Sequence, residues 1–209
     1  MQDETLLLDS TRLVGKTTNN AHGRSETTSA GVLKSCPEHD WYVLRATYSR
    51  ELKIQEMLRE KGVRTFVPMM WRKRVVAGKT EKKLVPAVSS LCFVYWDRES
   101  VDRFIRSFGD SRPVNYYWDR ASEAPLKVPE KAMDDFIKVA STMDEDLIYL
   151  TEISEKLREG QTVKVKDGPF KGVEGKIVRI RKSRRIFVEI PGMVAVATTY
   201  VLPEYLEIL

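Results

Sequence analysis

Two stretches of the chain carry the aromatic and branched residues typical of strands, and each is followed by a helical pattern. Residues 41–46 and 90–96 are these strand-like stretches. After the first, Ile54, Met57 and Leu58 lie at i, i+3 and i+4, which places them on one face of a helix. After the second, the same kind of face is formed by Val101, Phe104, Ile105 and Phe108. The pattern predicts two strand–helix units.

The predicted helices also carry signals at their ends. Ser49 is a residue type that caps helices, Glu51 suits the positive N-terminal end, and Gly62 suits the C-terminal end. Pro129 opens a third helix, at a position where the missing N–H of proline is harmless. The buried stripe of this helix is Met133, Phe136, Ile137 and Ala140.

A basic hairpin is predicted between the two units. Residues 63–70 read as a strand, and residues 72–85 read as a hairpin. Against the single acid Glu81, its first twelve residues hold the cations Arg72, Lys73, Arg74, Lys79, Lys82 and Lys83. With a last short strand at 114–118, the order predicts an α+β fold: a ferredoxin-like α/β sandwich with an inserted hairpin and with helices mainly on one face.

The last part of the chain predicts a small β-barrel. Val163 and Val165 alternate with lysines, as in a half-buried strand. The turn that follows has three turn formers, an apolar residue that fills its inside, and a later glycine that frees the backbone. These turn positions are Asp167, Gly168, Pro169, Phe170 and Gly175. Further strands are predicted at 186–190, 193–198 and 205–209, which together indicate an SH3-like barrel.

Composition divides the chain into four parts. Residues 1–40 are rich in Thr, Ser, Asn and Gly without periodicity, which predicts a mobile tail. The sandwich is expected at 41–140. The acidic, weakly periodic segment 141–159 is interpreted as a linker, and the barrel is expected at 160–209.

Bulk properties restrict the class of protein. The 209 residues carry a formal net charge of +5, and 42% are hydrophobic, enough for real cores. Two cysteines cannot build a disulfide framework and fit a reducing compartment. No apolar run approaches the ~18 residues of a membrane span, and the start lacks the pattern of a signal peptide. We therefore expect a cytoplasmic protein that does not enter membranes.

The turn at 163–178 resembles the KOW motif, which occurs in NusG-type transcription factors and in several ribosomal proteins. A Trp-Tyr strand, a ferredoxin-like domain of about 100 residues and a C-terminal KOW barrel, in this order, resemble the NusG family from residue 41 to the end. The segment Phe66-Val67-Pro68-Met69 is similar to specialised paralogues such as RfaH, and Gly78-Lys79 is similar to their basic hairpin tip. Residues 195–203 resemble the barrel ending of the UpxY branch, whose members control capsular polysaccharide operons.

One segment departs from the general NusG pattern. Ser89-Ser90-Leu91-Cys92 stands where general NusG has Pro-Gly-Tyr-Val. This difference favours a paralogue over the housekeeping factor.

The resemblance implies a factor that binds the clamp of RNA polymerase and suppresses pausing or termination. Such a factor favours the processive state of the enzyme by binding and makes or breaks no bond. The polymerase-binding strip of the family is carried over to Val88, Leu91, Phe93, Phe104 and Ile105. No catalytic residues and no cofactor are implied.

The resemblance also implies contact with non-template DNA or with nascent leader RNA. Single-stranded nucleic acid is bound by cations at phosphates and flat side chains at bases. The carried-over candidates are Arg45, Arg50, Lys53, Arg72, Lys73, Arg74 and Lys79. A ribosomal protein or a termination factor is the implied partner of the barrel, and we expect a monomer.

Each assignment has a structural alternative. Val88, Leu91 and Phe93 alternate along a strand, so core and clamp contact are equally supported, whereas Phe104 on a helix stripe favours the core. The basic hairpin could be a solvated edge that prevents aggregation. Cys36 and His39 suggest a metal or nucleophile site, but a structural zinc site needs four ligands. The chain has only two Cys and two His, and Cys92 lies inside a predicted strand.

Two other functions compete with the first. One is a ribosome- or RNA-binding KOW protein without a polymerase role, and the domain at 41–118 argues against it. The other is a general NusG elongation factor. The sequence pattern does not identify the operon that is served or the DNA or RNA element that recruits the protein. It also does not show whether the barrel changes its fold.

Overall fold

The computed structural model describes residues 38–76, 79–151, 159–180 and 182–209. Most of the predicted tail, including Cys36, lies outside the described residues, as do Gly78 at the hairpin tip and residues 152–158 of the predicted linker. All described residues belong to one compact unit, Ser35–Leu209. None of the helices in these ranges is long and apolar enough to cross a membrane.

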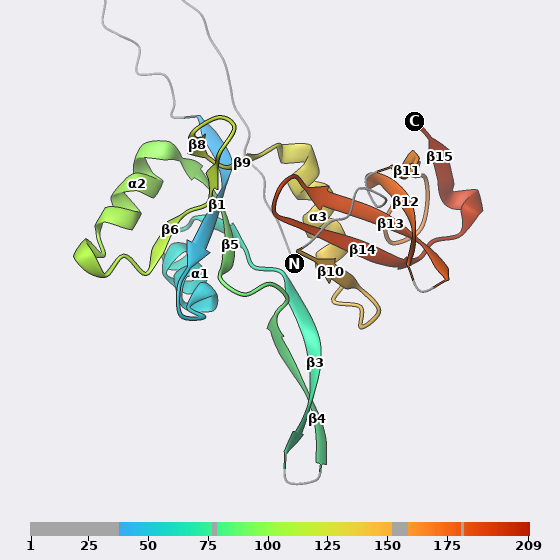
Figure 1. The fold of residues 1–209 in the computed structure, drawn as a ribbon, viewed down its shortest axis with the longest axis horizontal. Helices are drawn as coiled ribbons and strands as arrows, with labels where there is room; N and C mark the ends of the chain where they lie inside the picture. The colour runs from blue at the N-terminus through green and yellow to red at the C-terminus, as the bar shows by residue number, and fades with distance from the viewer. Residues whose placement is uncertain (1–37, 77–78, 152–158, 181) are drawn as a thin grey trace, which may run out of the picture. The chain divides into compact units, whose positions relative to one another are not determined.

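A five-stranded antiparallel sheet forms the N-terminal part (Figure 1). Its strand order is β2-β5-β1-β6, and β9 pairs with β1 as well. Across the centre, Val43 lies opposite Phe93, and Leu44 lies opposite Tyr116. The bounds are β1 His39–Ala46, β2 Arg64–Phe66, β5 Leu91–Asp97, β6 Val114–Tyr116 and β9 Lys127–Val128. Smaller elements that the sequence did not predict are η1 Gly109–Ser111, β7 Trp118–Asp119 and β8 Ala124–Pro125.

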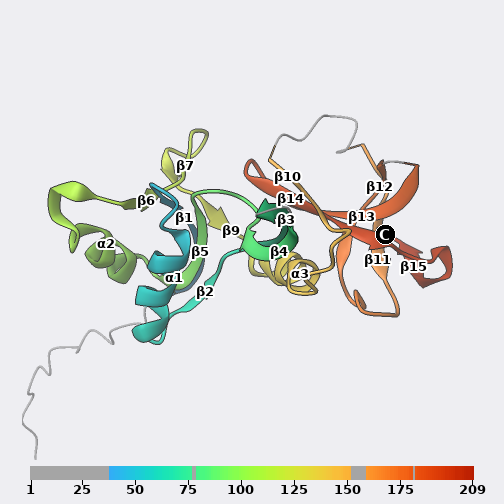
Figure 2. The ribbon, with the colours of Figure 1, turned by 90° about the horizontal axis from the view of Figure 1, so that it is seen from below.

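Three helices cover this sheet on both faces. Helices α1 (Glu51–Glu60) and α2 (Arg98–Arg106) share a buried cluster with Leu44 and Val94. Helix α3 (Glu130–Ala140) packs on the opposite face, where Phe136 lies against Phe93 with ring centroids 5.8 Å apart. Figure 2 shows α3 on the side of the sheet away from α1 and α2. The predicted α+β fold is confirmed, but the expectation that the helices lie mainly on one face is wrong, because α3 covers the face opposite α1 and α2.

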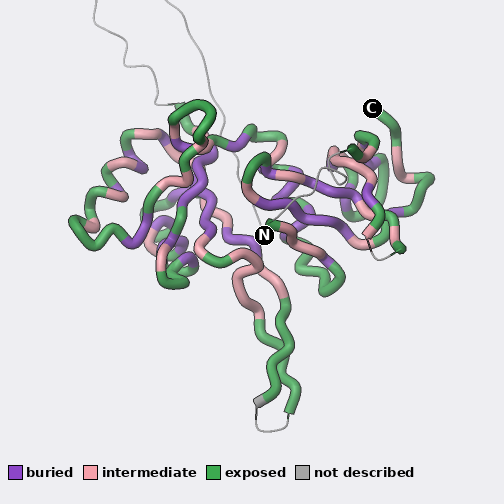
Figure 3. The backbone as a smooth tube through the Cα atoms, in the orientation of Figure 1, coloured by how far each residue is buried: buried purple, intermediate pink, exposed green. Residues whose placement is uncertain are grey.

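The predicted hairpin is a separate two-stranded sheet, which we call the ribbon. Strand β3 (Met69–Val76) pairs with β4 (Lys79–Pro86). The ribbon extends beyond the five-stranded sheet (Figure 1), and most of its length is exposed (Figure 3). The single strand predicted at 63–70 is in fact two strands, because β2 stops at Phe66 and Val67-Pro68 separates it from β3. Proline has no N–H to donate, so it suits such a break.

The C-terminal part is a six-stranded antiparallel sheet in the order β10-β14-β13-β12-β11-β15. One edge strand, β10, comes from the segment predicted as a linker, and its Tyr149 lies opposite Val196 of β14. A short helical turn, η2 (Pro203–Tyr205), precedes the last strand. The strand bounds are β10 Ile148–Leu150, β11 Thr162–Val165, β12 Glu174–Ile180, β13 Ser183–Ile190, β14 Val194–Tyr200 and β15 Leu206–Ile208.

The turn after β11 is held by close packing. Phe170 is buried in the same cluster as Val163 and Val165. A side chain at Gly175 would put its Cβ 2.6 Å from the carbonyl oxygen of Phe187, closer than real Cβ atoms come. Gly168 has a φ of +81°, which favours glycine, and its N–H donates to Asp167 Oδ1 at 2.8 Å, while Pro169 is exposed. The glycine at 175 is therefore required by strand proximity rather than by backbone freedom.

Candidate nucleic-acid and polymerase interface

The ribbon pairs like charges directly across its two strands. Arg72 lies opposite Lys83, and Lys73 lies opposite Lys82, whereas Arg74 lies opposite Glu81. Like charges in directly opposed positions destabilise a strand pair. A polyanion placed along the ribbon would relieve this repulsion, so the arrangement fits a phosphate backbone better than it fits a solvated edge.

The two faces of the ribbon differ in chemistry, because side chains alternate along each strand. One face carries only charges along its exposed middle, from Arg72, Arg74 and their partners on β4. The other face carries Lys73 together with Trp71 and Val75, whose side chains are 41% and 70% exposed. An exposed indole beside a cation is a surface on which a base can stack.

The loop before α1 is exposed and holds an aromatic side chain next to a cation. Tyr48 and Ser49 both have positive φ, +57° and +52°. The Arg50 guanidinium lies 5.6 Å from the centre of the Tyr48 ring, and Tyr48 is 84% exposed. The prediction that Ser49 caps α1 is wrong: Arg50 occupies the cap position, and no side chain caps the helix. A serine in the left-handed region points away from the amides that a cap must reach.

A cavity of about 440 Å³ lies between this loop and the end of the ribbon nearest the five-stranded sheet, around Arg72, Val85 and Pro86. We call this end of the ribbon its foot. Glu51 from the first turn of α1 and Arg72 from β3 both line it, with Leu52 and Pro86 as apolar walls. Glu51 is only 3% exposed. Within the described ranges its Oε2 has no hydrogen-bond partner.

The predicted nucleic-acid residues are all exposed, but they come from three elements. The ribbon holds Arg72, Lys73, Arg74 and Lys79. Arg50 and Lys53 belong to the start of α1, which the cavity joins to the ribbon. Arg45 extends from β1 two positions after Val43, on the sheet face that α3 covers. The cavity thus brings Arg72 close to the start of α1, whereas Lys79 lies at the distal end of the ribbon, opposite Val76.

The predicted polymerase strip is not one surface. Leu91 and Phe93 are 0% exposed and lie in the core between the sheet and α3, and Phe104 is buried on the opposite face between the sheet and α2. In this conformation none of the three can touch a partner, which corrects that part of the prediction. Strand alternation could not separate the core from a contact surface, because the sheet is covered on both faces.

Val88 and Ile105 remain partly exposed, on opposite faces of the sheet. Ile105 packs against the cluster of α1 and α2. Val88 packs against the cluster that contains Leu91 and Phe93. Eleven further partly buried apolar residues pack against that same cluster, among them Phe66, Ile137 and Tyr149. We call Val88 with these three the apolar rim.

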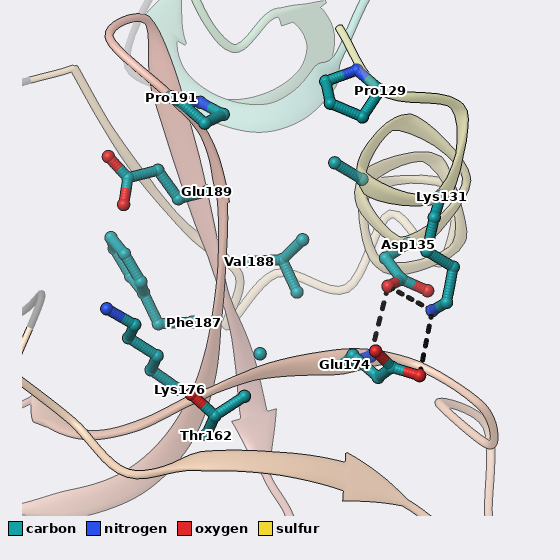
Figure 4. A pocket seen from close by; sticks show the side chains of 12 residues that line it. Pro129, Lys131, Asp135, Thr162, Glu174, Lys176, Phe187, Val188, Glu189 and Pro191 are labelled. Carbon is teal, nitrogen blue, oxygen red and sulfur yellow. Dashed lines mark hydrogen bonds and ion pairs between the residues drawn. The ribbon is translucent and has the colours of Figure 1, made fainter. Parts of the chain in front are cut away.

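Helix α3 also binds the barrel through a set of polar contacts (Figure 4). Lys131 Nζ lies 3.7 Å from Glu174 Oε1 and donates to the carbonyl oxygen of Gly172 at 3.2 Å. Asp135 Oδ2 accepts from the backbone N–H of Glu174, and Lys138 donates to the carbonyl oxygen of Lys171. A cavity of about 390 Å³ lies beside these contacts. No local pattern predicted this junction, because its groups lie 33 to 41 residues apart in the sequence.

Strand β10 adds contacts between the barrel and the foot of the ribbon. The Tyr149 hydroxyl donates to the carbonyl oxygen of Met69 at 3.3 Å, and burial raises the pKa of Tyr149 to about 12. Lys82 of the ribbon pairs with Glu145 and thereby lowers the pKa of that carboxyl. One of the ribbon's cations is therefore already engaged within the chain.

Metal and nucleophile sites find no support in the part of the chain that is described. That part holds no group of three or more His, Cys, Asp or Glu side chains placed to bind a metal ion. Burial raises the pKa of the Cys92 thiol to about 12, so this cysteine is unreactive at neutral pH.

Two family models match the chain. The model described as "Transcription termination factor nusG" matches residues 39–137, and the model described as "KOW motif" matches residues 159–189. A solved structure described as "Domain interaction in Thermotoga maritima NusG" is 19% identical, with a TM-score of 0.43, over 82% of this chain and 98% of that chain. None of the curated proteins compared with the chain matches it.

The sheet with its ribbon and the barrel after it thus define a two-part protein of the class found among transcription factors. The chain carries a NusG N-terminal domain followed by a KOW motif. Factors of the NusG family act with RNA polymerase.

Proposed function

We propose that the protein is an operon-specific elongation and antitermination factor of the UpxY type, serving capsular polysaccharide operons. It binds the clamp of RNA polymerase and suppresses pausing or termination. The NusG N-terminal domain supports this proposal, because an RNA-binding KOW protein without a polymerase role would not need it. Residues 195–203 and the departure at 89–92 support the specialised branch over a general NusG factor.

The apolar rim is our proposed polymerase contact in place of the predicted strip. Val88 lies in the segment that joins the ribbon to β5, so a partner that reaches it also passes the foot of the ribbon. Leu91 and Phe93 support this surface from beneath. Apolar residues surrounded by polar ones are typical of a protein contact.

The charged ribbon is our proposed contact with non-template DNA or leader RNA, and it carries the nucleic-acid part of the proposal. Its like-charge pairs are the single most informative observation, since a free ribbon gains nothing from them. The barrel is proposed to bind a ribosomal protein or a termination factor.

The test is transcription in vitro over a long template with pause sites, with and without the protein. We expect fewer and shorter pauses, and retention of core polymerase on the immobilised protein. Clear RNA binding without polymerase retention would favour the ribosomal alternative instead. An equal effect on every template would favour a general elongation factor.

A further inference from the structure

One pair of opposed lysines on the ribbon shares a carboxylate that comes from outside the ribbon. Lys73 and Lys82 lie directly opposite each other, on the ribbon face that also carries Trp71. Lys82 Nζ pairs with Glu145 Oε1, in the segment between α3 and β10. The hydrogen bond from Lys82 and the charges of Lys82 and Lys73 lower the pKa of Glu145 against the opposing effect of desolvation. One acid thus compensates a like-charge pair that would otherwise be destabilising.

The turn that carries Glu145 is held by its neighbours and not by this ion pair alone. Asp144 Oδ1 accepts from the backbone N–H of Asp146 at 2.8 Å, and the Asp144 carbonyl oxygen accepts from the N–H of Leu147 at 3.2 Å. Arg185 of the barrel donates to the carbonyl oxygen of Asp146 at 2.7 Å, and Leu147 is buried in the core. A preformed turn therefore presents the carboxylate to the ribbon. We call residues 144–146 the acidic turn.

We propose that the acidic turn is an internal competitor of nucleic acid: Glu145 occupies the position on the ribbon that a phosphate takes when a strand binds. The inference rests on the proposed nucleic-acid contact of the ribbon and adds how that contact is regulated. A phosphate and Glu145 cannot both lie between Lys73 and Lys82, so a strand that covers this face must displace the turn. By reciprocity, whatever holds the turn on the ribbon weakens the binding of nucleic acid.

A carboxylate resembles a phosphate in the contact that it makes with lysine. Both groups offer anionic oxygens to the ammonium group, and such charge-assisted hydrogen bonds are stronger than neutral ones. The residues on either side of Glu145, Asp144 and Asp146, are also acidic and exposed. The turn therefore repels a polyanion that approaches this face of the ribbon, in addition to occupying the lysines.

The strength of the contact suits a competitor that a strand can displace. The side chains of Lys82 and Glu145 are 49% and 51% exposed, and exposed ion pairs contribute little to stability. A nucleic-acid strand releases counterions at several phosphates at once, so it can replace a single carboxylate.

The other face of the ribbon provides an internal comparison. Arg72 and Lys83 are directly opposed there, and neither forms an ion pair with any residue that the structure describes. Removal of the Glu145 charge should therefore change what Lys82 contributes to nucleic-acid binding but not what Lys83 contributes.

The test uses the full-length protein and measures its affinity for fluorescently labelled short single strands of thymidine or uridine at low salt. We expect Glu145→Gln to bind these strands about two- to fivefold more tightly than the unaltered protein, the factor that corresponds to the loss of one exposed ion pair. The matched control is Glu123→Gln, which removes an equal charge from the exposed loop between β7 and β8 and should leave the affinity unchanged. Equal affinity of the two variants would overturn the proposal.

Two altered backgrounds show whether Glu145 acts through the lysines of the ribbon. With Lys73 and Lys82 both changed to Gln, adding Glu145→Gln should bring no gain, because the carboxylate has no lysine left to occupy. With Arg72 and Lys83 changed instead, binding should weaken but the gain should remain. All of these residues are exposed, so each variant should fold. An equal gain in both backgrounds would mean that Glu145 acts only through its long-range charge, and would overturn the proposal.

The same measurements separate this inference from the proposed function. Strand binding that does not depend on Glu145 overturns the inference alone. Absence of strand binding from every variant overturns the nucleic-acid contact of the ribbon and this inference with it, whereas the polymerase role is tested independently by the pausing assay.

Discussion

Asp135 Oδ2 accepts a hydrogen bond from the backbone N–H of Glu174 at 3.2 Å, and this bond joins α3 to the first residue of β12. The Asp135 side chain is 9% exposed and also pairs with Lys131. Helix α3 thus packs its apolar face on the five-stranded sheet while a buried carboxylate on its other side binds the barrel. Both halves of the described chain depend on the same helix.

Replacing Asp135 by Ala should loosen the barrel from α3. The change leaves the partly buried Glu174 N–H without its acceptor, and we expect a loss of about 1 kcal/mol. Amide hydrogen exchange at Glu174 and its neighbours on β12 measures it. The matched control is Asp134→Ala, because among the described residues Asp134 makes an exposed pair with Arg64 alone, which should contribute less than about 1 kcal/mol. Equal protection in the two variants would contradict the role of Asp135.

Phe93 and Val88 should respond to substitution in opposite ways. Phe93→Ala removes a fully buried ring that contacts Phe136, and it should lower the free energy of unfolding by about 3–5 kcal/mol. Val88→Asp changes a partly exposed residue of the apolar rim, so it should leave most of the stability and abolish polymerase retention. Urea unfolding and polymerase pull-down of both variants measure the two effects. Retention of polymerase by folded Val88→Asp would exclude the rim.

The order of elements could be predicted from the sequence because each element has its own local pattern. The stripe Ile54, Met57 and Leu58 predicted α1, and alternation around Val163 predicted β11. Strand β10 could not be found in this way. It has only three residues, and it is a strand because β14 offers an edge to pair with. Pairing over such a distance leaves no periodic signal.

The candidate site was predictable only where charge alone defines it. The cations of the ribbon stood out by their density between 72 and 83. Burial of Leu91 and Phe93 could not be derived, because it depends on where α3 packs. The cavity with Glu51 was missed for the same reason: a glutamate in the first turn of a helix is ordinary until the ribbon is placed beside it.

The ribbon should account for the salt dependence of nucleic-acid binding. Changing Arg72, Lys73 and Arg74 together to Ser should reduce the slope of log affinity against log salt by about 2, since each lost phosphate contact on a single strand removes about 0.7. The control is the triple change of Arg179, Lys182 and Arg184, exposed cations of the barrel, to Ser. A titration at several salt concentrations compares the two. An unchanged slope in the ribbon variant would show that the ribbon makes no phosphate contacts and is only a solvated edge of the protein.

Asp97 should make the stability of the N-terminal domain depend on pH in acid. Its Oδ1 accepts from the Ser100 N–H at 2.9 Å at the start of α2. Burial acts to raise the pKa of Asp97, but hydrogen bonds from Ser100 and from the Asp97 backbone N–H, together with the charge of His39, outweigh it and hold the pKa below the ordinary 3.8. A lowered pKa in the folded state gives stability that is complete above about pH 3.8 and is lost as the pH falls through the folded value.

Two variants of Asp97 test this dependence by urea unfolding at neutral pH and at about pH 3. Asp97→Ala should lose about 0.5–2 kcal/mol at neutral pH, because it removes the cap. Asp97→Asn keeps a capping oxygen that does not titrate, so its stability should fall less in acid than that of the unaltered protein. The same acid loss in Asp97→Asn would mean that other carboxyls cause it.

Strand β10 determines where the chain can be cut. A C-terminal fragment that starts at residue 160 would lack the strand that pairs with Ala195, Val196 and Ala197. The edge of β14 would then be open to pairing with a second molecule, a common route to aggregation. A fragment that begins before Ile148 keeps its own edge strand and should stay soluble at concentrations where the shorter one precipitates.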